Sequence, residues 1–269
     1  MTRPLRVAVV GAGPAGMYAA GHLLEGPGGT YLAGRLQQIT DRDIEVDVID
    51  RLATPWGLLR HGVAPDHPEK KLAQTVFRAV ARRPGFRYFG NVKVGTDVHP
   101  DDLGQWYDAV VYTSGAAEDN HLGVPGENLD GCWSAREFVG WYNGHPDCRT
   151  LDIDLGHERA VVVGNGNVAM DMARILCTDS EELARSDIAD HALDRLRGSK
   201  VREVVVLGRR AHFHGAFNNP ELEELGRLRN VDIAVEGAEP FCDLDPALDG
   251  IDQAGRRKMA TIRQFAERP

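Results

Sequence analysis

Short apolar runs alternate with amphipathic stretches over the first part of the chain. Leu5–Val10 is a short apolar run of the kind found in parallel strands that are covered on both faces. Pro14–Leu24 follows with helical spacing, and Ile44–Asp50 alternates like a second strand. Two further runs provide strand material and close a first unit, Phe86–Val94 and Ala109–Thr113.

One stretch between these strands has the period of an amphipathic helix. Within Glu69–Arg83, the side chains of Leu72, Val76 and Val80 fall on one face. The spacing predicts a helix whose apolar side consists of these three residues.

The later part of the chain repeats the same order of elements. Ala160–Val163 is typical of a strand, Asn167–Cys177 of a helix and Val201–Leu207 of the next strand. Asn219-Pro220-Glu221 resembles an N-cap, a first-turn proline and the start of a helix, and Val231–Val235 predicts one more strand. Repeated strand–helix–strand units predict an α/β fold with parallel sheets and right-handed crossovers.

Composition bounds the function. The chain has 269 residues, 42% of them hydrophobic, which suits two domains; we expect them at 1–115 and 116–269. The formal net charge of −9 disfavours nucleic-acid binding, which needs a basic surface. No uninterrupted apolar stretch reaches the roughly 18 residues of a membrane span. An apolar N-terminal run after Arg3 and Arg6 superficially resembles a signal peptide, but its glycines favour a strand followed by a helix.

The cysteines are sparse. Cys132, Cys148, Cys177 and Cys242 include no C-x-x-C pair. This pattern disfavours a cysteine-ligated iron–sulphur cluster, a zinc ribbon and a dithiol active site, and it suits a reducing cytoplasm.

The first glycine motif, residues 9–16 (VVGAGPAG), follows a predicted strand and opens a predicted helix. Gly11 permits the tight turn, Gly13 lets the backbone approach a pyrophosphate, and Gly16 lets the helix pack closely on the sheet. The helix N-terminus offers N–H groups to the phosphates. Asp50 ends the next strand, later than the usual ~20 residues because Glu25–Asp43 is inserted. A glycine-rich turn in another α/β protein is the alternative.

The second glycine motif, residues 163–169 (VGNGNVA), precedes a strand that ends in Gly208-Arg209-Arg210, with no acid. An acid accepts hydrogen bonds from a ribose 2′-hydroxyl and repels a 2′-phosphate, whereas arginines bind the phosphate. We therefore expect FAD in the first unit and NADP(H) in the second, on two Rossmann-like, three-layer domains. A solvated loop is the alternative for the two arginines.

Several segments together resemble the adrenodoxin-reductase-like branch of ferredoxin–NADP(+) reductases, of bacterial, actinobacterial type. The segments are VVGAGPAGMYAA at 9–20, TPWGLLRHGVAPDHP at 54–68, FVGWYNGHP at 138–146, VVVGNGNVAMDMARIL at 161–176, VVVLGRR at 204–210 and AFNNPELEEL at 216–225. The resemblance covers nearly the whole chain. It implies a reductase that oxidises NADPH on FAD and passes electrons to ferredoxin or a similar iron–sulphur carrier.

The resemblance also implies residue roles. The pyrophosphate of FAD would lie at Gly11, Gly13, Pro14 and Ala15, its ribose at Asp50, its adenine near the backbone of Lys93, and its flavin at Trp56 and Leu58. The pyrophosphate of NADP would lie at Gly164, Asn165, Gly166, Asn167 and Val168, and its adenosine end at Arg209, Arg210 and Glu221. His67 and Glu224 would form a catalytic ionic pair beside the nicotinamide and flavin. The alternative for His67 is a histidine in an Asp-His-Pro turn whose hydrogen bonds are made locally and which has no catalytic role.

Other features depart from this family or leave alternatives open. After Arg210 the chain reads Ala211-His212-Phe213, so we expect a reshaped phosphate loop. The family continues well beyond Pro269 and returns to the FAD domain, so we expect that domain to be incomplete and to hold FAD weakly. The rival interpretations are an inert nucleotide-binding remnant and a subunit like the NADPH-oxidising one of glutamate synthase. A docking surface for an acidic carrier would consist of Lys70, Lys71, Arg78, Arg82 and Arg83, unless these form a solvated helix face.

Overall fold

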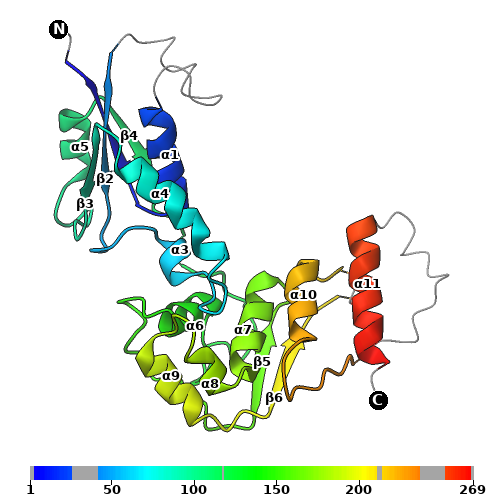
Figure 1. Cartoon of the computed structure of the whole chain (residues 1–269). Helices are drawn as coiled ribbons and strands as arrows, with labels where there is room; N and C mark the ends of the chain where they lie inside the picture. The colour runs from blue at the N-terminus through cyan, green and yellow to red at the C-terminus, as the bar shows by residue number, and fades with distance from the viewer. Residues whose placement is uncertain (1–2, 26–41, 117, 211–213, 237–251, 268–269) are drawn as a thin grey trace. The chain divides into compact units, whose positions relative to one another are not determined.

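A computed structural model describes residues 3–25, 42–116, 118–210, 214–236 and 252–267. The chain divides into two compact units (Figure 1). Unit 1 comprises residues 1–63 and 67–123, and unit 2 comprises 64–66 and 124–269. Each unit contains one parallel sheet, as the α/β prediction requires. Residues 26–41 of the predicted insertion lie outside the described residues, as do residues 211–213, where a reshaped phosphate loop was expected.

Unit 1 is built on a four-stranded parallel sheet with the strand order β3-β2-β1-β4. Its strands are β1 (Leu5–Val10), β2 (Ile44–Ile49), β3 (Phe86–Phe89) and β4 (Ala109–Tyr112). Its helices are α1 (Pro14–Leu24), α3 (Leu58–His61), the 3₁₀ helix η1 (Lys70–Ala73), α4 (Gln74–Ala81) and α5 (Pro100–Trp106). The predicted bounds of β1 and α1 are confirmed exactly.

Apolar residues of the central strands face both ways, which produces three layers in unit 1. On one face Val9, Val46 and Val48 pack against α1 and α4, where Met17 and Phe77 are buried. On the other face, Ala8 and Ile49 pack against Leu103 of α5. A strand buried on both sides explains the continuous apolar run of β1.

One charged residue lies within this sheet. The side chain of Asp47, in β2, is 2% exposed. Its carboxylate accepts two hydrogen bonds from the Arg87 guanidinium at 2.6 and 2.7 Å and one from the Tyr107 hydroxyl at 2.7 Å. The Arg6 guanidinium lies 3.5 Å away. Buried charge is tolerated here because it is both paired and hydrogen-bonded.

The helix predicted over Glu69–Arg83 differs in the structure. It consists of η1 followed by α4, and its buried residues are Phe77 and Val80. Leu72 and Val76 are 64% and 51% exposed, so the predicted apolar face was wrong for these two residues. The 3₁₀ turn has three residues per turn, and this changes the angular position of Leu72 relative to α4.

Unit 2 contains a two-stranded parallel sheet with helices around it (Figure 1). Its elements are α6 (Ala135–Tyr142), β5 (Arg159–Val163), α7 (Asn167–Cys177), α8 (Ser180–Leu183), α9 (Asp190–Arg197), β6 (Glu203–Leu207), α10 (Asn219–Leu225) and α11 (Gln253–Ala266). The predicted bounds of α7 are confirmed exactly. The helix predicted from Asn219-Pro220 is also present, but its N-cap is Asn218, and the predicted N-cap Asn219 is already the first helical residue.

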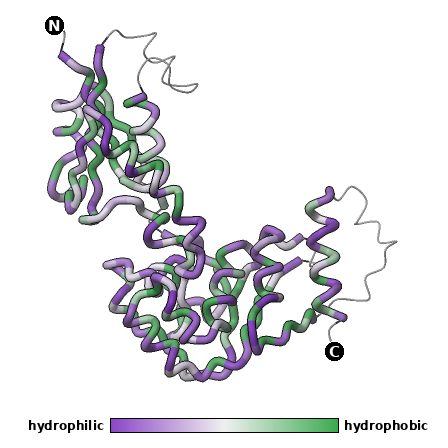
Figure 2. Tube along the Cα trace, in the orientation of Figure 1, coloured by the Kyte–Doolittle hydropathy of each residue, from purple (hydrophilic) through white to green (hydrophobic). Residues whose placement is uncertain are grey.

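Two apolar clusters stabilise unit 2. One surrounds Trp141 and Tyr142 of α6 and Leu193 of α9. The other joins Val162 of β5 and Met170 of α7 to α10 and α11. Figure 2 shows hydrophilic and hydrophobic segments alternating along α11, whose Ile262 and Phe265 are buried.

Two strand predictions require correction. Residues 231–235 form no strand, and β3 ends at Phe89 although strand was expected as far as Val94. After Phe89 the chain turns through Asn91, whose φ is 58°, and the N–H of Val92 donates to Asp50 O. Among the described helices none is long and apolar enough to span a membrane.

Candidate nucleotide-binding sites

The first glycine motif forms a tight turn between β1 and α1, in which Gly11 and Gly16 leave no room for a side chain. Gly11 has φ of 109°, and a Cβ there would lie 2.4 Å from Thr113 O. A Cβ on Gly16 would lie 1.9 Å from Gly11 O, so the predicted role of Gly16 in close helix packing is confirmed. At Gly13, by contrast, a Cβ would meet its nearest neighbour at 4.0 Å. The N-terminus of α1 is therefore open at Gly13, where a ligand would approach.

Asp50 lies at the same turn. Its Oδ2 accepts a hydrogen bond from Ala12 N at 2.7 Å, and its Oδ1 accepts one from Leu52 N at 2.8 Å. A carboxylate has about four acceptor positions, so two N–H donors leave capacity for hydroxyl groups. The strand end thus presents a fixed negative charge beside the α1 N-terminus.

The loop after β2 packs onto this turn. Trp56 N donates to Ala12 O at 2.9 Å, and Trp56 has φ of 91°, a strained value for a bulky residue. A Cβ on Gly57 would lie 2.8 Å from the Cα of Gly13. Leu58 is 70% exposed, and its side chain is available to a ligand.

Lys93 lies in a separate loop of unit 1. Its backbone N–H donates to Asp97 Oδ2 at 2.7 Å, and its carbonyl accepts from the N–H groups of Thr96 and Asp97. These bonds fix the backbone at which adenine is predicted to bind.

The second glycine motif connects β5 to α7. Gly164 has φ of 122°, and a Cβ on either Gly164 or Gly166 would meet nothing within 4 Å. The segment after β6 fixes the other side of this turn: Asn165 O accepts from Ala216 N and Phe217 N, and Asn167 Oδ1 accepts from Asn218 N. The α7 N-terminus is therefore held by hydrogen bonds at Asn165 and Asn167, and it has free space for a ligand at Gly164 and Gly166.

Two arginines follow β6. Arg209 and Arg210 are exposed, and within the part of the chain that the structure describes neither side chain forms an ion pair. Glu221, in the first turn of α10, is buried at 8% exposure. Exposed guanidinium groups at a strand end suit a phosphate ligand.

The residues predicted as a catalytic pair belong to different units. His67, in unit 1, is 5% exposed, and its Nδ1 lies 2.9 Å from Glu69 Oε1. Burial would raise the pKa of Glu69, but hydrogen bonds from its own backbone N–H and from His67 together lower it below its usual value. Glu224, in unit 2, has its Oε2 3.4 Å from Nη1 of Arg174.

Arg174 is the buried centre of a partly exposed charge cluster in unit 2, which sequence reasoning did not single out. The residue is 4% exposed. Its Nε and Nη2 donate to the two carboxylate oxygens of Asp66 at 2.6 and 3.0 Å. Its Nη2 also lies 2.9 Å from Asp171 Oδ1. Burial alone would lower the pKa of Arg174, but these carboxylates raise it further above its usual value.

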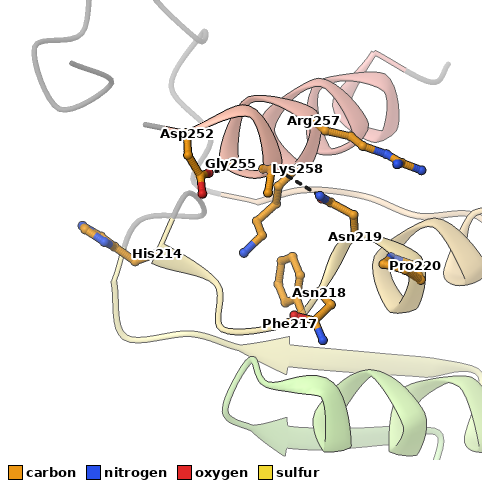
Figure 3. Close-up of a pocket in the computed structure, with 10 residues that line it drawn as sticks. His214, Phe217, Asn218, Asn219, Pro220, Asp252, Gly255, Arg257 and Lys258 are labelled. Atoms are coloured by element: carbon orange, nitrogen blue, oxygen red, sulfur yellow. Dashed lines mark hydrogen bonds between the residues drawn. The ribbon is translucent and has the colours of Figure 1, made fainter. Parts of the chain in front are cut away.

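Unit 2 also has a surface pocket of about 630 Å³ between the starts of α10 and α11 (Figure 3). Lys258 donates to Gly215 O at 2.5 Å, and its ammonium lies 4.9 Å from the centre of the Phe217 ring. Asn219 Nδ2 donates to Ala254 O at 2.9 Å. The lining includes none of the predicted site residues.

A family of known proteins matches the part of the chain that contains both glycine motifs. The family model described as pyridine nucleotide-disulphide oxidoreductase matches residues 5–235. The chain belongs to this oxidoreductase family. The match runs from β1 past α10 and includes both glycine motifs.

Within this oxidoreductase family, the chain resembles several named reductases. It is 45% identical over 266 residues to NADPH-ferredoxin reductase FprA of Mycobacterium tuberculosis, covering 99% of this chain and 56% of the relative. It is 46% identical over 236 residues to the mitochondrial NADPH:adrenodoxin oxidoreductase of Arabidopsis thaliana, covering 87% and 46%. A solved structure of M. tuberculosis FprA in complex with NADPH superimposes with a TM-score of 0.86, at 45% identity, covering 99% of this chain and 57% of that one. The chain spans about half the length of these relatives.

The resemblance to ferredoxin–NADP(+) reductases stated from the sequence is confirmed by these relatives. The Arg174 cluster was missed although both of its sequence segments, VAPDHP and VAMDMAR, belong to the motifs quoted above. An arginine on the apolar face of a helix, with an acid three residues before it, was the available signal. Its main partner, Asp66, lies 108 positions away, and no local pattern reveals that pairing.

Proposed function

We propose that this chain binds FAD in unit 1 and NADP(H) in unit 2, and that it is part of an NADPH-dependent flavoprotein reductase that supplies electrons to a ferredoxin-like iron–sulphur carrier. The supporting observation is the contrast between the two strand ends. Asp50 holds a carboxylate at the first glycine motif, whereas Arg209 and Arg210 hold exposed guanidinium groups after the second.

In unit 1 the residues present fit a dinucleotide with a free 2′-hydroxyl. The space at Gly13 admits a pyrophosphate against the N–H groups at the start of α1. Asp50 retains acceptor capacity for ribose hydroxyls and repels an added phosphate. Pro14 and Ala15 would border the pyrophosphate, the backbone of Lys93 the adenine, and Trp56 and Leu58 the flavin.

In unit 2 the residues present fit NADP(H). Gly164–Val168 form an open α7 N-terminus for the pyrophosphate, and Arg209 and Arg210 would bind the 2′-phosphate. Glu221, at the start of α10, would accept hydrogen bonds from the adenosine end. Selection of NADPH over NADH follows from the two guanidinium groups.

The chemistry follows from the two cofactors. Bound FAD supplies the ability to accept hydride from NADPH and to release electrons one at a time. The protein contributes geometry and electrostatics: His67 and Glu224 would orient the reacting rings. In keeping with a cytoplasmic reductase, the four cysteines are unclustered in the sequence.

The docking surface for an acidic carrier would lie along η1 and α4. Lys70, Arg78 and Arg82 are exposed there. Arg83 contributes less, because its guanidinium donates to Gly21 O at 2.8 Å and lies 3.8 Å from Glu25. We expect electron transfer to the carrier to lose part of its salt dependence when Lys70 and Arg78 are made neutral. An unchanged salt dependence would exclude this surface.

The experiment that tests the cofactor assignment compares two matched glycine substitutions. Gly13 and Gly166 precede α1 and α7 in the same way, with φ of −72° and −93°, and both have room for a Cβ. We expect Gly13→Ala to weaken FAD binding at least tenfold and to leave NADP⁺ binding unchanged, and Gly166→Ala to do the reverse. Titration calorimetry with each nucleotide measures both effects.

Two outcomes would overturn the proposal. Equal affinity of the parent protein for NADH and NADPH would remove the role of Arg209 and Arg210. Loss of both nucleotides in one variant would show that the two sites are not separate. Stopped-flow mixing with NADPH then separates an enzyme from an inert nucleotide-binding protein, because only the enzyme bleaches the flavin absorbance.

A further inference from the structure

The tripeptide Ala64-Pro65-Asp66 belongs to unit 2 although the residues on both sides of it belong to unit 1. The chain therefore enters unit 2 for three residues and leaves again. Ala64 and Pro65 are buried, at 1% and under 2% exposure. The third residue, Asp66, adds a specific polar contact to this burial.

Arg174 supplies that contact. Its planar guanidinium binds both carboxylate oxygens of Asp66, at 2.6 and 3.0 Å, in a bidentate arrangement that fixes orientation as well as distance. The side chains of Arg174 and Asp66 are 5% and 23% exposed, so solvent screens this pair less than a surface pair. Arg174 also contacts Asp171 on its own helix, which holds the guanidinium in place from the α7 side.

The same guanidinium contacts one residue of the predicted catalytic pair and the sequence neighbour of the other. It contacts Glu224 directly, at 3.4 Å. It holds Asp66, which is joined to His67 by one peptide bond. Arg174 lies on α7, whose first turn carries the second glycine motif. One rigid helix therefore connects the proposed pyrophosphate site to Glu224 and to the segment that leads into His67.

We propose that Arg174 is a positioning residue of the proposed reductase: through Asp66 it anchors the 64–66 segment, which leads into His67, and it holds the Glu224 carboxylate in place for hydride transfer. This inference rests on the proposed function. It assigns Arg174 and Asp66 no contact with the reacting atoms. Misplacement of a positioning group by about 1 Å can cost up to about a hundredfold in rate, so a measurable effect is expected.

The test uses Asp66→Asn, Arg174→Lys and a control, Glu223→Gln. Glu223 binds Arg257 in a bidentate pair of similar length, 2.6 and 2.8 Å, in the same unit. That control pair does not contact the 64–66 segment. Asp66→Asn keeps the shape of the side chain and exposes less uncompensated charge than removal of Arg174, so it is the variant most able to fold.

The first readout is hydrogen exchange of the peptide covering residues 63–69, which requires no cofactor. We expect its exchange to accelerate at least tenfold in Asp66→Asn and Arg174→Lys and to stay unchanged in Glu223→Gln. The second readout is the limiting rate of flavin reduction at saturating FAD and NADPH. We expect it to fall about tenfold in the first two variants, while the Kd for NADP⁺ changes less than twofold.

The outcomes separate the inference from the function on which it rests. Unchanged exchange over 63–69 in Asp66→Asn would overturn the anchor. Faster exchange with an unchanged limiting rate of flavin reduction would overturn the positioning role. So would a weakening of NADP⁺ binding by the same factor as the fall in that rate. Absence of flavin reduction in the parent protein would refute the proposed function, and the exchange readout would still decide whether Arg174 holds the segment.

Discussion

The buried carboxylate of Asp47 permits a quantitative prediction for the stability of unit 1. Asp47→Asn keeps the side-chain volume but replaces one acceptor oxygen with a donor that faces the Arg87 guanidinium. Two charge-assisted hydrogen bonds, at 2.6 and 2.7 Å, are weakened or lost. Hydrogen bonds to charged groups contribute about 1.5–3 kcal/mol each.

The full sum does not apply, because the Arg87 side chain is 49% exposed and water can solvate it in the variant. The Tyr107 hydroxyl can still donate to the remaining amide oxygen. We therefore expect the free energy of unfolding of unit 1 to fall by about 2–3 kcal/mol. In a double-mutant cycle with Arg87→Met, the coupling between the two residues should be about 1–2 kcal/mol.

The measurement is native-state hydrogen exchange of the β1 and β2 amides. These amides report on unit 1 alone, whereas a single melting curve would mix two units that can unfold separately. Leu5→Val, at the partly buried start of β1, serves as the control, because it shows how much stability the loss of one methylene group costs in this sheet. A coupling below about 0.5 kcal/mol would refute the view that the buried pair stabilises the sheet.

Three further predictions concern single features of the two units. Gly16→Ala should destabilise unit 1 by about 3 kcal/mol or more, seen as exchange of the α1 amides, since its Cβ would lie 1.9 Å from a backbone oxygen that cannot rotate away; a neutral result would contradict the described turn. Burial and the hydrogen bond to Asp47 raise the pKa of Tyr107 to about 12, against about 10 when unfolded. The protonated hydroxyl therefore stabilises the fold fully below pH 10, and this contribution is lost as the pH rises towards 12. The urea midpoint of Tyr107→Phe should fall less over that range than the midpoint of the parent protein. Identical pH profiles of the two proteins would exclude a contribution of Tyr107. Lys258→Met should loosen α11 by about 1 kcal/mol, read as faster proteolysis within residues 253–266, because both the bond to Gly215 O and the contact with Phe217 are lost; an unchanged cleavage rate would show that Ile262 and Phe265 alone hold the helix.

The sequence predicted best those elements whose local signals agree. For β1 and α1, an apolar run, a glycine turn and helical spacing follow one another within 20 residues, and both bounds were exact. The same signals recur at α7, with the same result. The glycine motifs also predicted the backbone conformation, because φ near 110–120° at Gly11 and Gly164 admits no other residue easily.

The sequence predicted worse where a contact outside the segment decides the structure. The apolar residues Leu72 and Val76 suggested a buried face, yet both are exposed: Leu72 lies in the 3₁₀ turn at 70–73, and α4 buries Phe77 and Val80 instead of Val76. Residues 231–235 alternate like a strand but form none, because alternation alone does not provide a pairing partner. The ion clusters of Asp47 and Arg174 join residues 40 and 108 positions apart, which no periodicity encodes. The assignment of individual residues to FAD and NADP(H) stays a prediction.

The brief passage of residues 64–66 through unit 2 bears on how the two halves can be produced separately. A single cut after Gly123 would yield a C-terminal fragment that lacks Asp66 and leaves a nearly inaccessible guanidinium without its bidentate carboxylate. Such a fragment should express poorly until the missing acid is provided, for example by a grafted linker that carries Ala-Pro-Asp. A chimaera of two related chains meets the same constraint. If its C-terminal part came from one parent and residues 64–66 from the other, Asp66 and Arg174 would no longer come from the same protein.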